Sequence, residues 1–199
     1  MLCTSNIGTA QNKMSPSEAE AFKINVEKKL QERKTVVADF DAVRNISVLK
    51  KPVYSSGVFK LKDKKMLWSY NPPRMNAMVF DHNKLYMKDE QGEISTIDLL
   101  KNRRFRQLQK LIVARESNQL FDDSQFDIEF LKNGSEIVVV LNPKLKEIAR
   151  WIQWIELTFD AADYSVTEIK ITEQSNDYMH FKLRNKQFNV TISDSEFKL

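Results

Sequence analysis

The residues that could act as nucleophiles, bases or metal ligands are few in this sequence. It contains two histidines, His82 and His180, and one cysteine, Cys3. A structural zinc site needs four ligands, and a serine or cysteine nucleophile commonly relies on a histidine base. Each histidine lies in a strand-like or turn-like run and is interpreted as an ordinary surface or core side chain. We therefore predict no catalytic residue, no bound metal and no cofactor, and a single cysteine excludes an internal disulfide.

Carboxylates and glycines give no catalytic pattern either. Asp39 and Asp41 lie two residues apart on one face of a predicted strand, and Asp122 is followed by Asp123. A glycosidase needs two carboxyl groups that face each other across a cleft and differ in pKa, and no such asymmetry is visible. The four glycines, at positions 8, 57, 92 and 134, are too widely spaced for a glycine-rich phosphate loop. The two common nucleotide-binding loops are thereby excluded.

Length and composition are those of one soluble domain. The chain has 199 residues, of which 42% are hydrophobic and 29% are charged, which is enough material for one core. A total of 31 Lys and Arg against 27 Asp and Glu gives a net charge of +4. This is a mild bias towards anionic lipids or nucleic acids, because acidic residues are interspersed. No stretch approaches the roughly 18 consecutive apolar residues that cross a bilayer.

Residues 1–14 are predicted to precede the folded domain, as the remnant of a signal peptide or as a disordered end. Gly8-Thr9-Ala10 has the small-x-small form of a secretory cleavage site, although no charged and apolar region stands before it. Cys3 after Leu2 is compatible with the remainder of a lipid-attachment site. A plain polar end with a chance cysteine is the third interpretation, and the sequence leaves all three open.

Two stretches have a helical period. Ser15-Pro16-Ser17-Glu18 has the residues of a capping box, and Phe22, Val26 and Leu30 follow at intervals of four. This pattern predicts an amphipathic helix over residues 16–33. Residues 99–115 have a second helical pattern with clustered Lys and Arg. We interpret its basic face mainly as solvated, with docking to an anionic lipid or a partner as the next alternative and nucleic acid as the last.

Short apolar and polar alternations recur between residues 36 and 97 and between 126 and 192. Their period of two is typical of strands, and the segments between them are too short for parallel crossovers. Asn133-Gly134 is the strongest hairpin signal. Ten or eleven strands with two helices predict a mainly β fold, an incomplete antiparallel β-barrel with helices over its open face. A barrel wider than one filled by its own side chains encloses a cavity, here for an apolar ligand.

Several short motifs follow one another along the chain. The first half contains S-G-V-F-K-L at 56–61, L-W-S-Y-x-x-P at 67–73 and D-x-x-x-L-Y at 81–86. The second half contains L-I-V-A-R at 111–115, I-E-L-T-F-D at 155–160, I-K-I-T-E at 169–173 and N-x-x-I-x-D-x-x-F at 189–197. In this order and spacing, over about residues 20–199, they resemble the outer-membrane lipoprotein carrier family, LolA. Lys62-Asp63-Lys64-Lys65 stand where that family has an Arg-Pro pair, and Asn83 stands where it has a glycine.

The resemblance implies a single LolA-like domain over residues 15–199 and a monomeric carrier in the periplasm of a Gram-negative bacterium. Such a carrier takes the acyl chains of a lipoprotein from an inner-membrane lipoprotein-releasing ABC transporter and passes them to an outer-membrane receptor, without contacting nucleic acid. One alternative is a membrane-anchored LolB-like lipoprotein receptor, and another is a carrier for a different lipid pathway. A lipid-acting enzyme is a third alternative, for which no nucleophile and base are recognisable.

Strand alternation selects the inward-facing side chains expected to bind lipid. The strands contribute Phe40, Phe59, Leu61, Met66, Trp68, Leu85, Met87, Ile155, Leu157, Phe159, Ile171 and Phe181. The second helix contributes Phe105, Leu108 and Ile112. Methionine and aromatic side chains usually form a core, but a flexible lining of this kind also suits acyl chains of varied shape. A one-residue bulge would invert the set of any one strand.

Overall fold

The structure, a computed structural model, describes residues 12–102, 105–106, 109 and 120–199. Its elements within these residues are β1 (Asn12–Lys13), α1 (Pro16–Glu32), β2 (Thr35–Asn45), β3 (Val53–Lys62), β4 (Lys65–Tyr70), β5 (Ala77–Asp81), β6 (Lys84–Lys88), β7 (Ile94–Asp98), β8 (Phe126–Asn133), β9 (Glu136–Pro143), α4 (Lys146–Ala149), β10 (Ile152–Asp160), β11 (Val166–Glu173), β12 (Tyr178–Phe188) and the 3-10 helix η1 (Asp194–Phe197).

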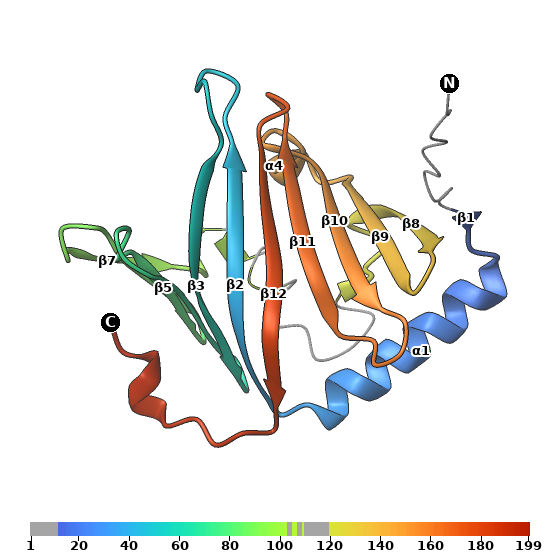
Figure 1. Cartoon of the computed structure of the whole chain (residues 1–199), viewed down its shortest axis with the longest axis horizontal. Helices are drawn as coiled ribbons and strands as arrows, with labels where there is room; N and C mark the ends of the chain where they lie inside the picture. Colours follow the sequence, from blue (N-terminus) through green and yellow to red (C-terminus); the bar gives the residue numbers. More distant parts are fainter. Residues whose placement is uncertain (1–11, 103–104, 107–108, 110–119) are drawn as a thin grey trace, which may run out of the picture.

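The strands of the described residues form one twelve-stranded antiparallel sheet, in the order β1-β8-β9-β10-β11-β12-β2-β3-β4-β5-β6-β7. Two meanders, β2 to β7 and β8 to β12, are joined where β12 pairs with β2 and Phe181 lies opposite Ala42. The sheet is strongly curved and runs from β1 to β7 without closing (Figure 1). The predicted mainly β fold with an incomplete antiparallel barrel is therefore confirmed.

Strand number and boundaries differ from the prediction in three places. The described strands number twelve instead of ten or eleven, because the two residues of β1 are too few to show an alternation. Since Asn12 pairs with Lys132 of β8, the sheet includes residues that we assigned to the segment before the domain. The last stretch of alternation, expected to reach residue 192, forms one strand, β12, that ends at Phe188 and has a register shift near Asn185, whose φ is 51°.

Helix α1 begins as its capping box predicts and ends at Glu32, one residue early. The Ser15 hydroxyl accepts a hydrogen bond from the Glu18 amide at 3.4 Å, and the Ser15 amide donates to the Glu18 carboxylate at 2.8 Å. Phe22 and Val26 are buried in one core with residues of β8 to β10. Figure 1 shows α1 beside this half of the sheet. This packing makes α1 the cover of one half of the sheet.

The second predicted helix, over residues 99–115, lies mostly outside the described residues. Of its expected ligand-facing side chains, only Phe105 is described, in a helical conformation, whereas Leu108 and Ile112 lie outside. Residues 1–11 also lie outside, so the expectations for Cys3 and Ala10 stay predictions.

A separate apolar core lies on the face of the sheet opposite to the one that α1 covers, and we call this opposite face the outer face. Ile192 and Phe197 of the carboxy-terminal segment, both buried, pack there around Val79 of β5. Lys62 donates hydrogen bonds to the Ile192 carbonyl at 2.9 Å and to the Asp194 carboxylate at 2.7 Å. The last ten residues are therefore fastened over strands from the first half of the chain.

The cap of α1 gives a prediction about acid stability. Hydrogen bonds from Lys132 and Ser15 lower the pKa of the Glu18 carboxyl from 4.5 to about 2. Because the folded-state pKa is below the unfolded one, these bonds stabilise the fold above pH 4.5, and this stabilisation is lost as the pH falls towards 2. Replacing Glu18 by Gln should therefore lower the Tm most at pH 7, less as the pH falls below 4.5, and hardly at all at pH 2 or below.

Thermal unfolding followed by circular dichroism across this pH range would check the prediction. The control is Glu20→Gln on the same helix, since Glu20 contacts only the Lys23 amine at 3.7 Å among the ion pairs of the described residues. A Tm difference for Glu18→Gln that does not change with pH would contradict the assignment.

Candidate functional site

The pairing register places the predicted ligand-facing side chains on one face of the sheet. Residues directly opposite one another in antiparallel strands share a face. Phe181 lies opposite Ile169, Ile169 lies opposite Leu157, Leu157 lies opposite Val139, and Val139 lies opposite Phe130. We call this the inner face. It carries α1 on one half, so the side chains here are arranged as the alternation predicts.

Aromatic rings fill the inner face over β2 to β4 and β12. The ring centroid of Trp68 lies 4.6 Å from that of Phe40, 4.7 Å from that of Phe181 and 5.4 Å from that of Phe59. Tyr70 contacts Phe40 edge-on at 5.2 Å. These five residues form what we call the aromatic cluster. Such tilted and edge-on pairs add to the stabilisation from burial, so this region is packed and not an empty cavity.

The predicted side chains fall into two separate clusters on the inner face. Phe40, Phe59, Leu61, Met66, Trp68, Leu85 and Phe181 are buried around the aromatic cluster, with Met87 and Phe105 partly buried against them. Ile155, Leu157 and Phe159 are buried with Phe22 of α1, with Ile171 partly buried beside them. The alternation correctly found the face but could not show that α1 already covers the second group.

Few polar atoms lie among these rings. Burial raises the pKa of the Tyr70 hydroxyl above its ordinary value. The indole Nε1 of Trp68 is buried without a hydrogen bond of ordinary length to the described residues. A surface so poor in polar partners can hold hydrocarbon, because burying apolar area costs no hydrogen bond there.

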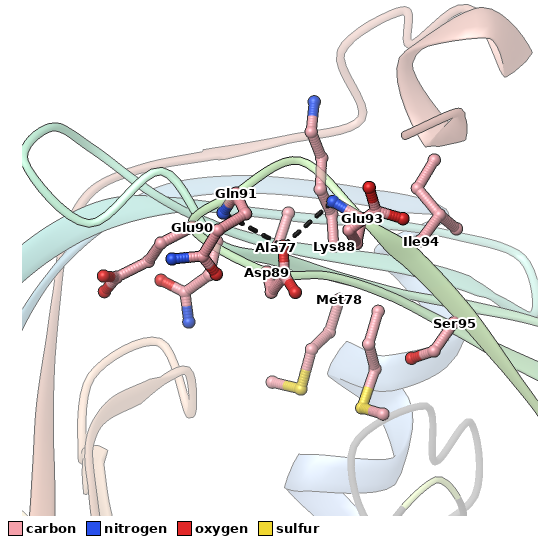
Figure 2. A pocket seen from close by; sticks show the side chains of 11 residues that line it. Ala77, Met78, Lys88, Asp89, Glu90, Gln91, Glu93, Ile94 and Ser95 are labelled. Carbon is pink, nitrogen blue, oxygen red and sulfur yellow. Dashed lines mark hydrogen bonds between the residues drawn. The ribbon is translucent and has the colours of Figure 1, made fainter.

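A pocket of about 480 Å³ lies at one end of β5, β6 and β7. Its lining consists of Asn76, Ala77, Met78, Met87, Lys88, Asp89, Glu90, Gln91, Glu93, Ile94 and Ser95. Met78 lies opposite Met87, and both also pack on the apolar core around the aromatic cluster. Figure 2 shows Met78 pointing away from the loop that carries Glu90 and Gln91. The two methionines therefore connect an open pocket with the inner face.

The loop at the edge of this pocket has a fixed shape. The Asp89 carboxylate accepts hydrogen bonds from the amides of Gln91 at 3.0 Å and Glu93 at 2.9 Å (Figure 2). The pocket is not predictable from the periodicity of the sequence, because its loop residues carry no periodic signal. The pairing of Met78 with Met87 across two strands that a short turn connects was the one signal available.

Each of the two histidines contacts a carboxylate on exposed or half-buried surface. His180 Nε2 lies 2.6 Å from the Glu168 carboxylate, and His82 Nδ1 lies 2.5 Å from Asp81. Burial alone would raise the pKa of Glu168, but hydrogen bonds from Lys182 and His180 lower it below its ordinary value. Among the described residues, no group of three or more His, Cys, Asp or Glu side chains is placed to hold a metal ion.

The sequence matches one protein family over almost its whole length. The model of the outer membrane lipoprotein carrier protein LolA matches residues 11–199. The chain belongs to the LolA family. The resemblance inferred from the motif order is thereby confirmed. None of the curated proteins matches this sequence.

Solved structures share the LolA-like fold at low sequence identity. A putative outer membrane lipoprotein-sorting protein domain from Vibrio parahaemolyticus has a TM-score of 0.51 at 11% identity, covering 92% of this chain and 95% of that one. An uncharacterized conserved protein from Thermus thermophilus has a TM-score of 0.56 at 10% identity, with coverages of 92% and 93%. The Pseudomonas aeruginosa MucA/MucB complex gives 0.53 at 9% identity, with 92% of this chain matching 61% of that one.

This LolA-family chain has lysines where the family's Arg-Pro pair is expected, and the structure gives them a role. Lys62 ends β3, Lys65 begins β4, and both amines contact the Asp194 carboxylate, at 2.7 and 3.3 Å. They lower the pKa of Asp194 through hydrogen bonds and charge. Lys60 pairs with Glu196 in the same way. The lysines thus fasten the carboxy-terminal segment to the outer face.

Proposed function

We propose that this chain is a periplasmic carrier that holds the acyl chains of lipoproteins, or of other lipids, on the inner face of its sheet. Membership of the LolA family supports the proposal, because the family is that of outer membrane lipoprotein carrier proteins. The observation that carries it is the aromatic and methionine-rich half of the inner face. This half includes no residue of α1 and is connected through Met78 and Met87 to an open pocket.

The energetics favour reversible binding. Burial of hydrocarbon contributes about 0.8 kcal/mol per methylene, so about ten buried methylenes would give about 8 kcal/mol. The rings of the aromatic cluster are packed against one another, with Phe40 fully buried and Trp68 6% exposed. Separating these rings to admit a chain costs part of that gain. Methionines adapt to irregular shapes, so Met66, Met78 and Met87 suit cargo of varied length.

The proposed carrier acts without catalysis, as LolA-family carriers do. Its proposed partners are the acyl chains, an inner-membrane lipoprotein-releasing ABC transporter that loads it and an outer-membrane receptor that unloads it. No helix of the described residues is long and apolar enough to span a bilayer. A carrier for another lipid pathway would use the same inner face with different partners.

Binding of a fluorescent fatty-acid probe tests the proposal. Met87 is half-buried at the junction of pocket and inner face, so Met87→Asp introduces a carboxylate that water can still reach before ligand binds. An acyl chain would then have to desolvate this charge, and probe affinity should fall at least about ten-fold. Trp68 is less suitable for this change, because Asp at a 6% exposed position would destabilise the fold.

Met75→Asp is the matched control, since Met75 is 56% exposed and does not line this pocket. Its probe affinity should equal that of the wild type. Native mass spectrometry of the purified wild-type protein should also show bound lipid. Absence of bound lipid together with absence of probe binding would overturn the proposal, and equal affinity of Met87→Asp and wild type would place the acyl chains elsewhere.

A further inference from the structure

Exposed apolar side chains gather at one end of the sheet. Eight large apolar residues of the described chain are exposed, and six of them lie in or next to connections at this end. The six are Val48, Leu49, Tyr54, Met75, Ile94 and Trp151. The pocket at β5 to β7 lies at the same end, since Ala77 begins β5 and Lys88 ends β6. Single exposed apolar residues are ordinary, but a group at one end marks a contact surface.

Three connections at this end are hydrogen-bonded together into what we call the rim, formed by residues 46–52, 144–151 and 174–177. The Ser47 amide donates to the Asp177 carboxylate at 2.7 Å. The Gln174 amide donates to the Trp151 carbonyl at 3.1 Å. Figure 1 shows the loop between β2 and β3 at the top of the view, with the β11–β12 turn and α4 near it. The rim is therefore one continuous surface.

At the tip of the rim, apolar side chains are exposed to solvent on a backbone that a hydrogen bond holds in a turn. The Leu49 amide donates to the Ile46 carbonyl at 2.9 Å, which closes a turn with Ser47 and Val48 at its two central positions. Val48 is 86% exposed and Leu49 46%. Trp151 immediately precedes β10 and is 55% exposed.

Basic side chains accompany the apolar tip. The loop of residues 46–52 contains Lys50 and Lys51, both exposed, and no acidic residue. No ion pair joins either lysine to a described residue. Arg150, also exposed, stands next to Trp151. Protruding apolar side chains, an indole ring and unpaired lysines occur together in segments that insert into the interface of a bilayer with anionic headgroups.

We propose that the rim docks this chain on a membrane surface containing anionic phospholipid, with Val48, Leu49 and Trp151 in the interface and Lys50 and Lys51 at the headgroups. The charge and the protruding apolar tip together favour a lipid surface over a protein groove. Docking would bring the pocket end of the sheet to the bilayer. The proposal adds to the carrier function, and its test needs no acyl chain bound on the inner face.

Vesicle sedimentation tests the proposal with the full chain. Wild-type protein should co-sediment with vesicles of phosphatidylcholine and phosphatidylglycerol, and much less with phosphatidylcholine alone. Because each lysine near such a surface contributes about a five-fold gain, Lys50→Glu combined with Lys51→Glu should reduce partitioning by ten-fold or more. Val48→Asp combined with Leu49→Asp should reduce it by a similar factor.

Ile24→Asp is the matched control, because Ile24 is 60% exposed on α1, away from the rim. It should bind vesicles like the wild type, and unchanged Tm values would show that the rim variants are folded. Failure of the wild type to bind phosphatidylglycerol vesicles would overturn the proposal and favour a protein partner for the rim. The proposal would also be overturned if Ile24→Asp lost as much vesicle binding as the rim variants, or if the rim variants lost no vesicle binding.

Discussion

Replacing Phe22 by alanine is expected to destabilise the fold by about 4 kcal/mol. Phe22 is 2% exposed and anchors α1 to the inner face. Its ring centroid lies 5.2 Å from that of Phe159, 5.8 Å from that of Phe121 and 5.9 Å from that of Phe130. The variant loses the burial of a phenyl group and leaves a cavity among rings that belong to separate segments, so the neighbours cannot all move to fill it.

Urea unfolding monitored by circular dichroism would measure the loss, with the slope against denaturant serving to check that unfolding stays two-state. Ile24→Ala is the control on the same helix. Ile24 is 60% exposed, so its truncation should change the free energy of unfolding by no more than about 0.5 kcal/mol. A loss below about 1 kcal/mol for Phe22→Ala would mean that α1 contributes little to the stability of the sheet.

The alternation of side chains was sufficient to predict the inner face, because it is a local property of each strand. Phe40, Phe59, Trp68 and Phe181 come from four strands, and all four lie on the face expected. These four residues belong to a different cluster from Phe159 because α1 covers only the half of the inner face that contains Phe159. The position of α1 is set by contacts between distant segments. Sequence periodicity contains no information on that choice, so one predicted lipid-binding surface proved to be two clusters.

The carboxy-terminal segment shows a second limit of the sequence. Ile192 and Phe197 were visible as a family motif, but their spacing fits neither a strand nor an α-helix. Lys62 and Lys65 stood out only because they occupy the place of the family's Arg-Pro pair, and their partner Asp194 is about 130 residues away. The contact between these lysines and Asp194 can be recognised only in the folded structure, where the carboxy-terminal segment lies against β3 and β4. Short elements without periodicity, such as α4, are missed for the same reason.

Gly57→Ala is the second change with a large expected effect, and it connects the stability of the sheet with the shape of the proposed ligand surface. A Cβ at Gly57 would lie 2.1 Å from the Ser69 carbonyl oxygen and 2.3 Å from Cζ of Phe40. Contacts this short require the backbone of β4 and the ring of Phe40 to move. Overpacking of this kind costs typically 1 to 3 kcal/mol, and here, with backbone on one side, about 3 kcal/mol is expected.

The control is Gly134→Ala in the β8–β9 turn, where nothing lies within 4 Å of a Cβ but φ is +61°. Left-handed strain alone should cost about 1 kcal/mol there, so urea unfolding should separate the two variants by about 2 kcal/mol. If Gly57→Ala lowers the free energy of unfolding by no more than Gly134→Ala does, then β3 and β4 can move apart at little cost. Phe40 packs against Trp68, Tyr70 and Phe181, with ring centroids at 4.6, 5.2 and 5.8 Å, so a displaced Phe40 would disturb the aromatic cluster. Gly57→Ala should therefore also weaken fatty-acid probe binding, whereas Gly134→Ala should leave it unchanged. If Gly57→Ala lowers the stability but not the probe affinity, the acyl chain is held on a surface other than the packed aromatic cluster.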